Sequence, residues 1–212
     1  MRNWPLFELK ITTPNLSLHV PSLEELDELA DRAADGVHEE GQMPFIFPWT
    51  EGTPAERAQR TIQYHFSTWG RFSADEWAIE FVVVRDGQVL GVQGVTASDF
   101  RVLKEVKTGS WLGRPFQGQG VGTEMRQAVL HFAFAGLGAR YALTEAFDDN
   151  PASLRVTRKL GYHDDGFSLI KRGGEPVVSH RFRLPREDWK EQPGFEIHGL
   201  DACLPLFGLD KD

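Results

Sequence analysis

Residues 109–122 read GSWLGRPFQGQGVG, and this stretch decides the fold. A strand-like segment at 106–112 is followed by a glycine-rich loop at 113–120, and from residue 121 the apolar side chains recur at helical spacing. Glycines at such a turn let the backbone approach a ligand closely, and the first amides of the helix carry a partial positive charge. The stretch predicts a phosphate or pyrophosphate site, with a plain glycine-rich turn as the alternative.

Two common nucleotide-binding motifs do not fit this loop. A dinucleotide fingerprint starting at Gly118 needs a third glycine at position 123, where the chain has Thr123. A Walker A loop needs a lysine directly after its last glycine, and Gly122 is followed by that same threonine. Both standard nucleotide-binding motifs are therefore excluded, which leaves an anion site of another kind or a plain glycine-rich turn.

A third pattern fits. The spacing Gln117-x-x-Gly120-x-Gly122 resembles the Gln/Arg-x-x-Gly-x-Gly/Ala motif with which the GNAT family of N-acyltransferases holds the pyrophosphate of coenzyme A. The segment 109–113 resembles the central strand of that family, and the segments 150–153 (NPAS) and 159–162 (KLGY) resemble its second helix in contact with coenzyme A. The resemblance covers roughly residues 16–184 and is closest to the RimJ/RimL-like branch, which acylates protein N-termini and other amines.

A finer resemblance points to the acyl group. The segment 109–113 and four further segments look like a GNAT subgroup described as succinyltransferases: Trp4-Pro-Leu-Phe7, Ile11-Thr-Thr-Pro14, Pro48-Trp-Thr50 and Gly122-Thr-Glu-Met-Arg126. The resemblance implies succinyl-CoA as the donor, with acetyl-CoA as the alternative.

Helix and strand signals are intermixed along the chain. Capping boxes at 22–25 and 53–56 predict helices that end near Gly36 and residue 68, and further helices are expected from 121 to about 132 and from 150 to 161. Strands are expected at 16–20, 77–84, 89–97, 106–112, 141–146, 167–171 and 177–184. The fold class is α/β (α+β), and the GNAT resemblance implies one mixed, mostly antiparallel sheet flanked by about four helices. We expect an acyltransferase domain at 1–184 and an extension at 185–212 that packs on the domain or forms a subunit interface.

The resemblance also implies a set of residues that contact the acyl-CoA co-substrate. They are Ser110, Trp111, Leu112, Gln117, Gly118, Gln119, Gly120, Val121, Gly122, Asn150 and Ser153. Asn150 is in addition a natural N-cap before Pro151. Many GNAT enzymes protonate the leaving thiolate with a tyrosine, which here is replaced by Thr157, so the resemblance assigns the catalytic donor to Ser153.

The group that takes the proton of the amine is left open. Glu80, Glu145 and Asp148 are the candidates, although a carboxylate in such a position is more often an ordinary surface or ion-paired group than a base. The glutamate of RimL-type enzymes falls near Arg172, a departure that would let this arginine or another cation pair with an acyl carboxylate. The resemblance places the aromatic loop 37–52 where such enzymes bind the acceptor, and a loop held in place by aromatic packing fits its composition equally well. His38 could be a ligand or a base, and neither role is favoured.

Composition limits the remaining classes of function. The net charge of −8 disfavours a nucleic-acid surface and suits a cationic partner. Cys203 is the single cysteine, so an intrachain disulfide and a cysteine metal cluster are excluded, and no metal-ligand spacing is present. The opening ten residues lack a signal-peptide pattern, and no apolar run is long enough to span a membrane. We expect a cytoplasmic protein without a nucleic-acid or membrane partner, and its apolar tail favours a homo-oligomer.

These observations predict an enzyme, an acyl-CoA-dependent N-acyltransferase. It would move an acyl group, succinyl in preference to acetyl, from coenzyme A to a primary amine by direct attack. The acceptor could be a small molecule, a protein N-terminus or a lysine. The alternatives are a RimL-like acetyltransferase and a non-catalytic acyl-CoA-binding sensor, which the missing tyrosine and the unplaced base leave open.

Overall fold

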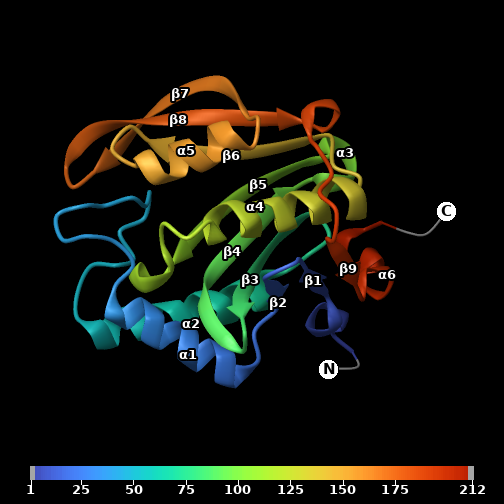
Figure 1. The fold of residues 1–212 in the computed structure, drawn as a ribbon, viewed down its shortest axis with the longest axis horizontal. Coiled ribbons are helices and arrows are strands. Elements are labelled where there is room, and N and C mark those ends of the chain that lie inside the picture. Colours follow the sequence, from blue (N-terminus) through green and yellow to red (C-terminus); the bar gives the residue numbers. More distant parts are fainter. Residues whose placement is uncertain (1–2, 210–212) are drawn as a thin grey trace.

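The computed structural model describes residues 3–209, which fold around a nine-stranded sheet (Figure 1). The strands are β1 (Lys10–Thr12), β2 (Ser17–His19), β3 (Glu76–Arg85), β4 (Gln88–Ser98), β5 (Glu105–Leu112), β6 (Tyr141–Phe147), β7 (His163–Arg172), β8 (Glu175–Pro185) and β9 (Glu196–His198). Their order in the sheet is β7-β8-β6-β5-β4-β3-β2-β1-β9, and every neighbouring pair is antiparallel except β5–β6. The predicted mixed, mostly antiparallel sheet is confirmed.

Helices cover both faces of this sheet. They are α1 (Leu23–Asp35), α2 (Pro54–Arg71), α3 (Phe100–Leu103), α4 (Val121–His131), α5 (Pro151–Lys159) and α6 (Leu200–Cys203). Both predicted capping boxes are formed, at the beginning of α1 and of α2. Four of the helices have nine or more residues, as the sequence predicts, and α3 and α6 are single short turns.

The sheet is buried on both faces because its strands alternate between two apolar layers. Trp77, Ile79 and Phe81 of β3 belong to the large core that includes the apolar side of α4. Val82 lies on the opposite face, in a smaller core with residues of α1 and β4. Side chains at alternate positions of β3 therefore face different helices.

The tail adds a strand that the sequence does not reveal. β9 pairs with β1, with Ile197 opposite Ile11, and the two strands lie side by side at one end of the molecule (Figure 1). Beyond it, Cys203 and Phe207 are fully buried against the body. Strands of three residues are too short for an alternating pattern to be recognised.

Two other strands can be compared with the expected ones. The expected strand at 16–20 is β2. β7 begins four residues earlier than expected, because an irregularity between Asp164 and Phe167 interrupts its pattern.

An opening in the sheet follows from the single parallel pair. β5 and β6 pair from Glu105↔Tyr141 to Lys107↔Leu143 and then diverge. β5 nevertheless stays paired with β4 up to Leu112↔Gly91. Beyond residue 108, half of the backbone N–H and C=O groups of β5 therefore have no strand partner and face this opening, called the gap below. The candidate functional site lies there.

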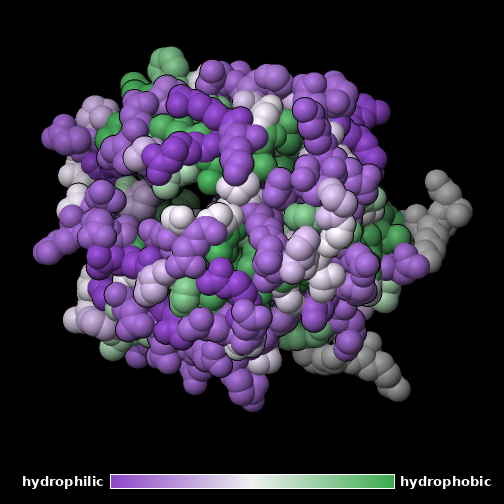
Figure 2. Space-filling view, in the orientation of Figure 1, coloured by the Kyte–Doolittle hydropathy of each residue, from purple (hydrophilic) through white to green (hydrophobic). Residues whose placement is uncertain are grey.

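The surface is polar over most of the face in Figure 2, which is hollowed between α5 and the loop that precedes α2. Hydrophobic side chains are visible at the margin of the hollow. In the part of the chain from residue 3 to residue 209, no helix has the length and apolar character needed to cross a membrane.

Candidate functional site

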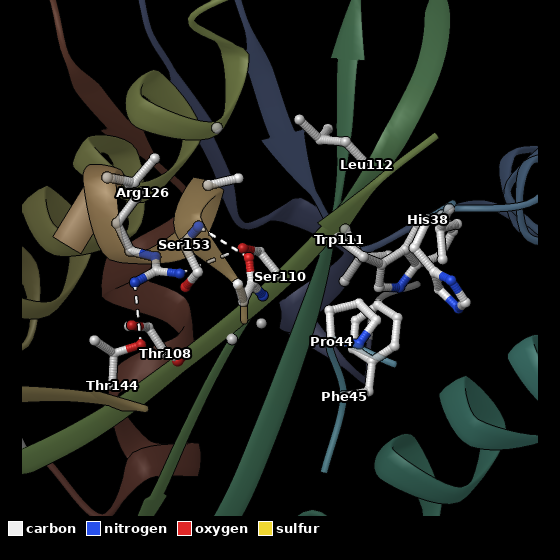
Figure 3. Close-up of a pocket in the computed structure, with 18 of the residues that line it drawn as sticks. His38, Pro44, Phe45, Thr108, Ser110, Trp111, Leu112, Arg126, Thr144 and Ser153 are labelled. Atoms are coloured by element: carbon white, nitrogen blue, oxygen red, sulfur yellow. Dashed lines mark hydrogen bonds between the residues drawn. The ribbon is translucent and has the colours of Figure 1, made fainter. Parts of the chain in front are cut away.

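A cleft of about 1230 Å³ occupies the opening between β5 and β6. Its walls come from the loop 37–49, from α2, and from the first turns of α4 and α5. Nine of the eleven predicted contact residues line it: Ser110, Trp111, Leu112, Gln117, Gly118, Gly120, Gly122, Asn150 and Ser153. Polar groups gather on one side of it, and the rings of His38, Phe45 and Trp111 on the other (Figure 3).

The glycine-rich loop has the properties of an anion site. Gly118 and Gly120 have φ angles of 73° and 85°, where glycine is favoured. A Cβ added at either position would meet no atom within 4 Å, so the space in front of them is open. The backbone amides of 118–122 donate no hydrogen bond within the described chain, and they begin helix α4. Free amides and the helix dipole together suit a pyrophosphate.

The side chains of the other residues in this motif have partners inside the protein. The Nε2 group of Gln117 donates to the carbonyls of Val37 (2.7 Å) and Leu112 (2.9 Å). Gln119 accepts from Arg85 and donates to the carbonyl of Pro115, outside the cleft. Val121 is buried in the core. The side chains of Gln119 and Val121 are thus not brought to the cleft, and Gln117 ties the loop 37–49 to the end of β5.

The first turn of α5 presents two polar groups to the cleft. The predicted N-cap is confirmed, because Oδ1 of Asn150 accepts from the amide of Ser153 at 3.1 Å, which leaves its Nδ2 group free to donate. The hydroxyl of Ser153 has no partner among residues 3–209. Thr157 is fully buried and does not line the cleft. On this helix, Ser153 is therefore the hydroxyl that a ligand could reach.

The aromatic loop forms the wall opposite α5. The ring of Trp111 lies 5.4 Å from that of Trp49, which lies 5.0 Å from that of Phe45. Both nitrogens of His38 are in hydrogen bonds, with Thr50 Oγ1 at 2.8 Å and with the carbonyl of Glu39 at 2.9 Å. His38 therefore holds the loop together. Within residues 3–209, no group of three or more His, Cys, Asp or Glu side chains is arranged to hold a metal ion.

Arg126 ends the segment 122–126 quoted above, but the sequence alone gives this arginine no role in the site. Only 5% of it is exposed, and its guanidinium bridges the two diverging strands, donating to Thr144 Oγ1 at 3.2 Å and Ser110 Oγ at 3.3 Å (Figure 3). No carboxylate pairs with it in the described chain, and its Nε group is buried without a partner. A charge between the apolar positions 125 and 129 of α4 is the signal that could have drawn attention to it. A buried cation of this kind favours an anionic ligand.

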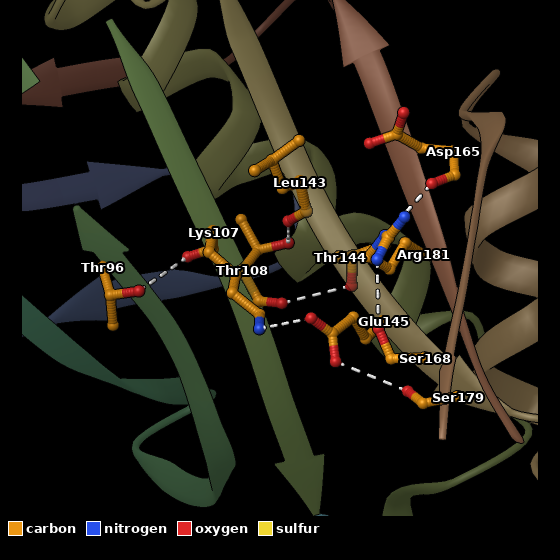
Figure 4. A network of polar contacts seen from close by, with 10 residues as sticks. All are labelled: Thr96, Lys107, Thr108, Leu143, Thr144, Glu145, Asp165, Ser168, Ser179 and Arg181. Carbon is orange, nitrogen blue, oxygen red and sulfur yellow. Dashed lines mark hydrogen bonds and ion pairs between the residues drawn. The ribbon is translucent and has the colours of Figure 1, made fainter. Parts of the chain in front are cut away.

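Most of the charged candidates from the sequence are already paired. Glu145 accepts from Lys107 at 2.6 Å (Figure 4), and Asp148 contacts His180 at 2.6 Å. Arg172 forms two hydrogen bonds with Asp149, of 3.1 and 2.6 Å, and this pairing lowers the pKa of the aspartate. Arg172 and the carboxylates of β6 and its following loop therefore have structural partners.

Glu80 is different, because it is buried beside the cleft without a cation. It is 8% exposed, lines the cleft from β3, and accepts a hydrogen bond of 3.1 Å from the hydroxyl of Tyr64 on α2. Burial raises the pKa of Glu80 to about 7, and the hydrogen bond from Tyr64 opposes this rise. A carboxylate that titrates near neutral pH suits proton transfer.

Comparison with known proteins agrees with this geometry. A family model described as an acetyltransferase (GNAT) domain matches residues 15–163. The solved structure of RimL, a ribosomal L7/L12 α-N-protein acetyltransferase in complex with coenzyme A, is 19% identical with a TM-score of 0.65, and the match covers 82% of this chain and 95% of that one. A ribosomal-protein-S5-alanine acetyltransferase from Vibrio fischeri is 16% identical with a TM-score of 0.63, covering 85% and 98% of the two chains. At such identities the solved structures show a shared fold.

Proposed function

Because the chain belongs to the GNAT acetyltransferase family, we propose that it transfers an acyl group from an acyl-coenzyme A thioester to a primary amine by direct attack. One observation carries the proposal, the position of the free amides of 118–122 beside the opening between β5 and β6. The amides suit the pyrophosphate of coenzyme A, and the opening suits the thioester arm at the other end of the same ligand.

The residues of the cleft would share the work of holding this co-substrate. The amides of 118–122 would bind the pyrophosphate, and the free Nδ2 group of Asn150 would donate to the pantetheine arm. Backbone amides of 110–112 that face the gap would donate to the thioester carbonyl and stabilise its developing negative charge. Thioester chemistry belongs to the co-substrate, while the protein positions it next to the amine.

Ser153 is proposed as the hydrogen-bond donor to the departing thiolate. Ser153→Ala should lower kcat by about 10- to 100-fold, because a positioned donor contributes about that much or more to the rate. The affinity for coenzyme A should stay within about threefold, since the N-cap bond uses the backbone amide of residue 153. Steady-state kinetics and calorimetric titration measure the two effects. Ser153→Thr, which keeps a hydroxyl, is the control, and an equal loss of affinity and kcat in the alanine variant would instead indicate positioning.

For the acyl group, we propose succinyl in preference to acetyl. Arg126 supports this choice, since its guanidinium lies at the closed end of the opening and lacks a carboxylate partner in the described chain. Arg172 is less suited, because Asp149 already neutralises it. A terminal carboxylate on the acyl chain would compensate the buried charge of Arg126, which an acetyl group cannot do.

A donor panel tests the function and its specificity together. Release of free thiol from succinyl-CoA and acetyl-CoA is measured with two amines, an alanyl peptide amide and Nα-acetyl-lysine methylamide. The wild-type protein should release thiol only when an amine is present, and kcat/KM should be higher with succinyl-CoA. In Arg126→Met, this preference should fall by about 10- to 100-fold, because losing a charged hydrogen-bond partner costs about 1.5–3 kcal/mol.

A second arginine provides the control for this panel. Arg155 also lines the cleft, but it is exposed on α5. Arg155→Gln should change kcat/KM for both donors by the same factor, because an exposed and solvent-screened charge does not discriminate between a succinyl and an acetyl group. An unchanged succinyl preference in Arg126→Met would remove the role of this residue. Equal rates with both donors in the wild-type protein would favour an acetyltransferase.

A further inference from the structure

Three residues form one row across the sheet beside the cleft. Glu80 of β3 lies opposite Gly94 of β4, and Gly94 lies opposite Gly109 of β5. Residues directly opposite one another in antiparallel strands point to the same face. This face is the one covered by α2, because Tyr64 of that helix donates to Glu80. The row ends at the gap, since β5 has already parted from β6 at this point.

The two glycines leave that face of the sheet bare. A Cβ at Gly94 would lie 2.6 Å from Oε2 of Glu80, so the carboxylate occupies the place of the missing side chain. A Cβ at Gly109 would meet nothing within 4 Å. The carboxylate thus lies over β4, about one strand spacing of 4.8 Å from β5, with open space between it and the gap. That space suits an amine nitrogen, with or without one water molecule.

The surroundings leave one carboxylate oxygen available. Oε1 accepts from Tyr64, while Oε2 has no hydrogen bond within residues 3–209. The charged and titratable groups around it are Tyr64, His65 and Arg71 of α2, Lys107 of β5 and Glu145 of β6. Lys107 and Glu145 neutralise each other, and burial lowers the pKa of His65 to about 4, so it stays neutral near pH 7. Glu80 is then the group on this face that can exchange a proton near neutral pH.

We propose that Glu80 is the proton acceptor for the attacking amine, and that Tyr64 is a positioning residue for its carboxylate. The inference rests on the proposed acyl transfer. Glu80 takes one proton from the ammonium form of the acceptor, and the freed nitrogen bonds to the acyl carbon. The carbon–sulfur bond breaks, the nitrogen loses a second proton, and the thiolate gains one. The products are an amide and a free thiol, and Glu80 returns its proton to solvent.

The proposal predicts a particular dependence on pH. A base must be ionised to act, so activity that depends on Glu80 is present above its pKa of about 7 and is lost as the pH falls below it. An α-amine has a pKa of about 7.7–8.0 and is largely neutral by itself at about pH 9.5. The need for a base is therefore greatest near pH 7 and smallest at high pH.

The test is a profile of kcat/KM between about pH 6 and pH 9.5, with the alanyl peptide amide as acceptor and succinyl-CoA as donor. Glu80→Gln, which keeps the size of the side chain, should lose about 100-fold or more near pH 7 and much less at about pH 9.5. Its affinity for coenzyme A should equal that of the wild-type protein. Tyr64→Phe should shift the acidic limb to higher pH, because removing a hydrogen bond to the carboxylate raises its pKa.

Glu76→Gln is the matched control, because Glu76 is exposed on the same strand and lies outside the cleft. Its profile should match that of the wild-type protein. A uniform loss at every pH in Glu80→Gln, or no loss, would overturn the role of Glu80 while the acyl transfer stands. Absence of thiol release by the wild-type protein with both amines of the donor panel would overturn both proposals.

Discussion

Replacing Gly120 by leucine is expected to weaken coenzyme A binding by about 100-fold or more, equivalent to about 2.7 kcal/mol. The open space in front of this glycine is the proposed place of the pyrophosphate, and a leucine side chain would fill it. The position also has a φ of 85°, which costs an L-residue about 1–2 kcal/mol. Calorimetric titration with coenzyme A measures the affinity, and thermal unfolding measures the backbone cost separately.

Gly138→Leu separates these two effects. Gly138 has a φ of 70° and equally open surroundings, but it does not line the cleft. This variant should lose a similar amount of stability and keep its affinity for coenzyme A. If a folded Gly120→Leu protein bound coenzyme A as tightly as the control, the pyrophosphate would have to lie elsewhere.

Replacing Phe207 by alanine is expected to lower the free energy of unfolding by about 3–5 kcal/mol. The side chain is fully buried, and its ring lies 5.0 Å from that of Trp77, 5.7 Å from that of Phe72 and 6.2 Å from that of Phe132. Alanine would leave a cavity between the tail and the central sheet. We therefore propose that the tail is an integral part of the domain, and denaturant unfolding measures the loss.

Val102→Ala is the control for this variant, because it also truncates an apolar side chain. Val102 is 80% exposed, so its removal should change stability by no more than about 0.5 kcal/mol. A similarly small effect for Phe207→Ala would mean that the tail contributes little to the fold.

The sequence predicts those features of the molecule that depend on short stretches of chain. The loop 117–122, the capping boxes and the N-cap Asn150 were all predicted, because each is determined by residues within a few positions of one another. The hairpin of β3 and β4 is predictable for the same reason, since only residues 86 and 87 separate its two strands.

Features that depend on distant pairing were not predictable. From the sequence, Glu80 cannot be distinguished from Glu145 and Asp148 as a candidate base. In the fold, it lies opposite Gly94 of β4 and accepts a hydrogen bond from Tyr64 of α2. From the sequence, Arg126 resembles any other charged residue on a helix. Its position is special only in the fold, where its guanidinium lies between the diverging strands β5 and β6. The sequence also offers Arg172 as a partner for an acyl carboxylate, but in the fold this arginine is paired with Asp149, 23 positions away in the chain.

The pairing of β1 with β9 has a consequence for the order in which the protein is made. Ile11 of β1 is synthesised 186 positions before Ile197 of β9, its outer partner in the sheet. Contacts between such distant segments form late, because the intervening chain must be brought together first. During synthesis, this edge of the sheet and the aromatic surface that receives Phe207 stay uncovered until the tail emerges. This edge of the sheet is therefore completed only after residues 196–198 have been synthesised, well after the strand they cover.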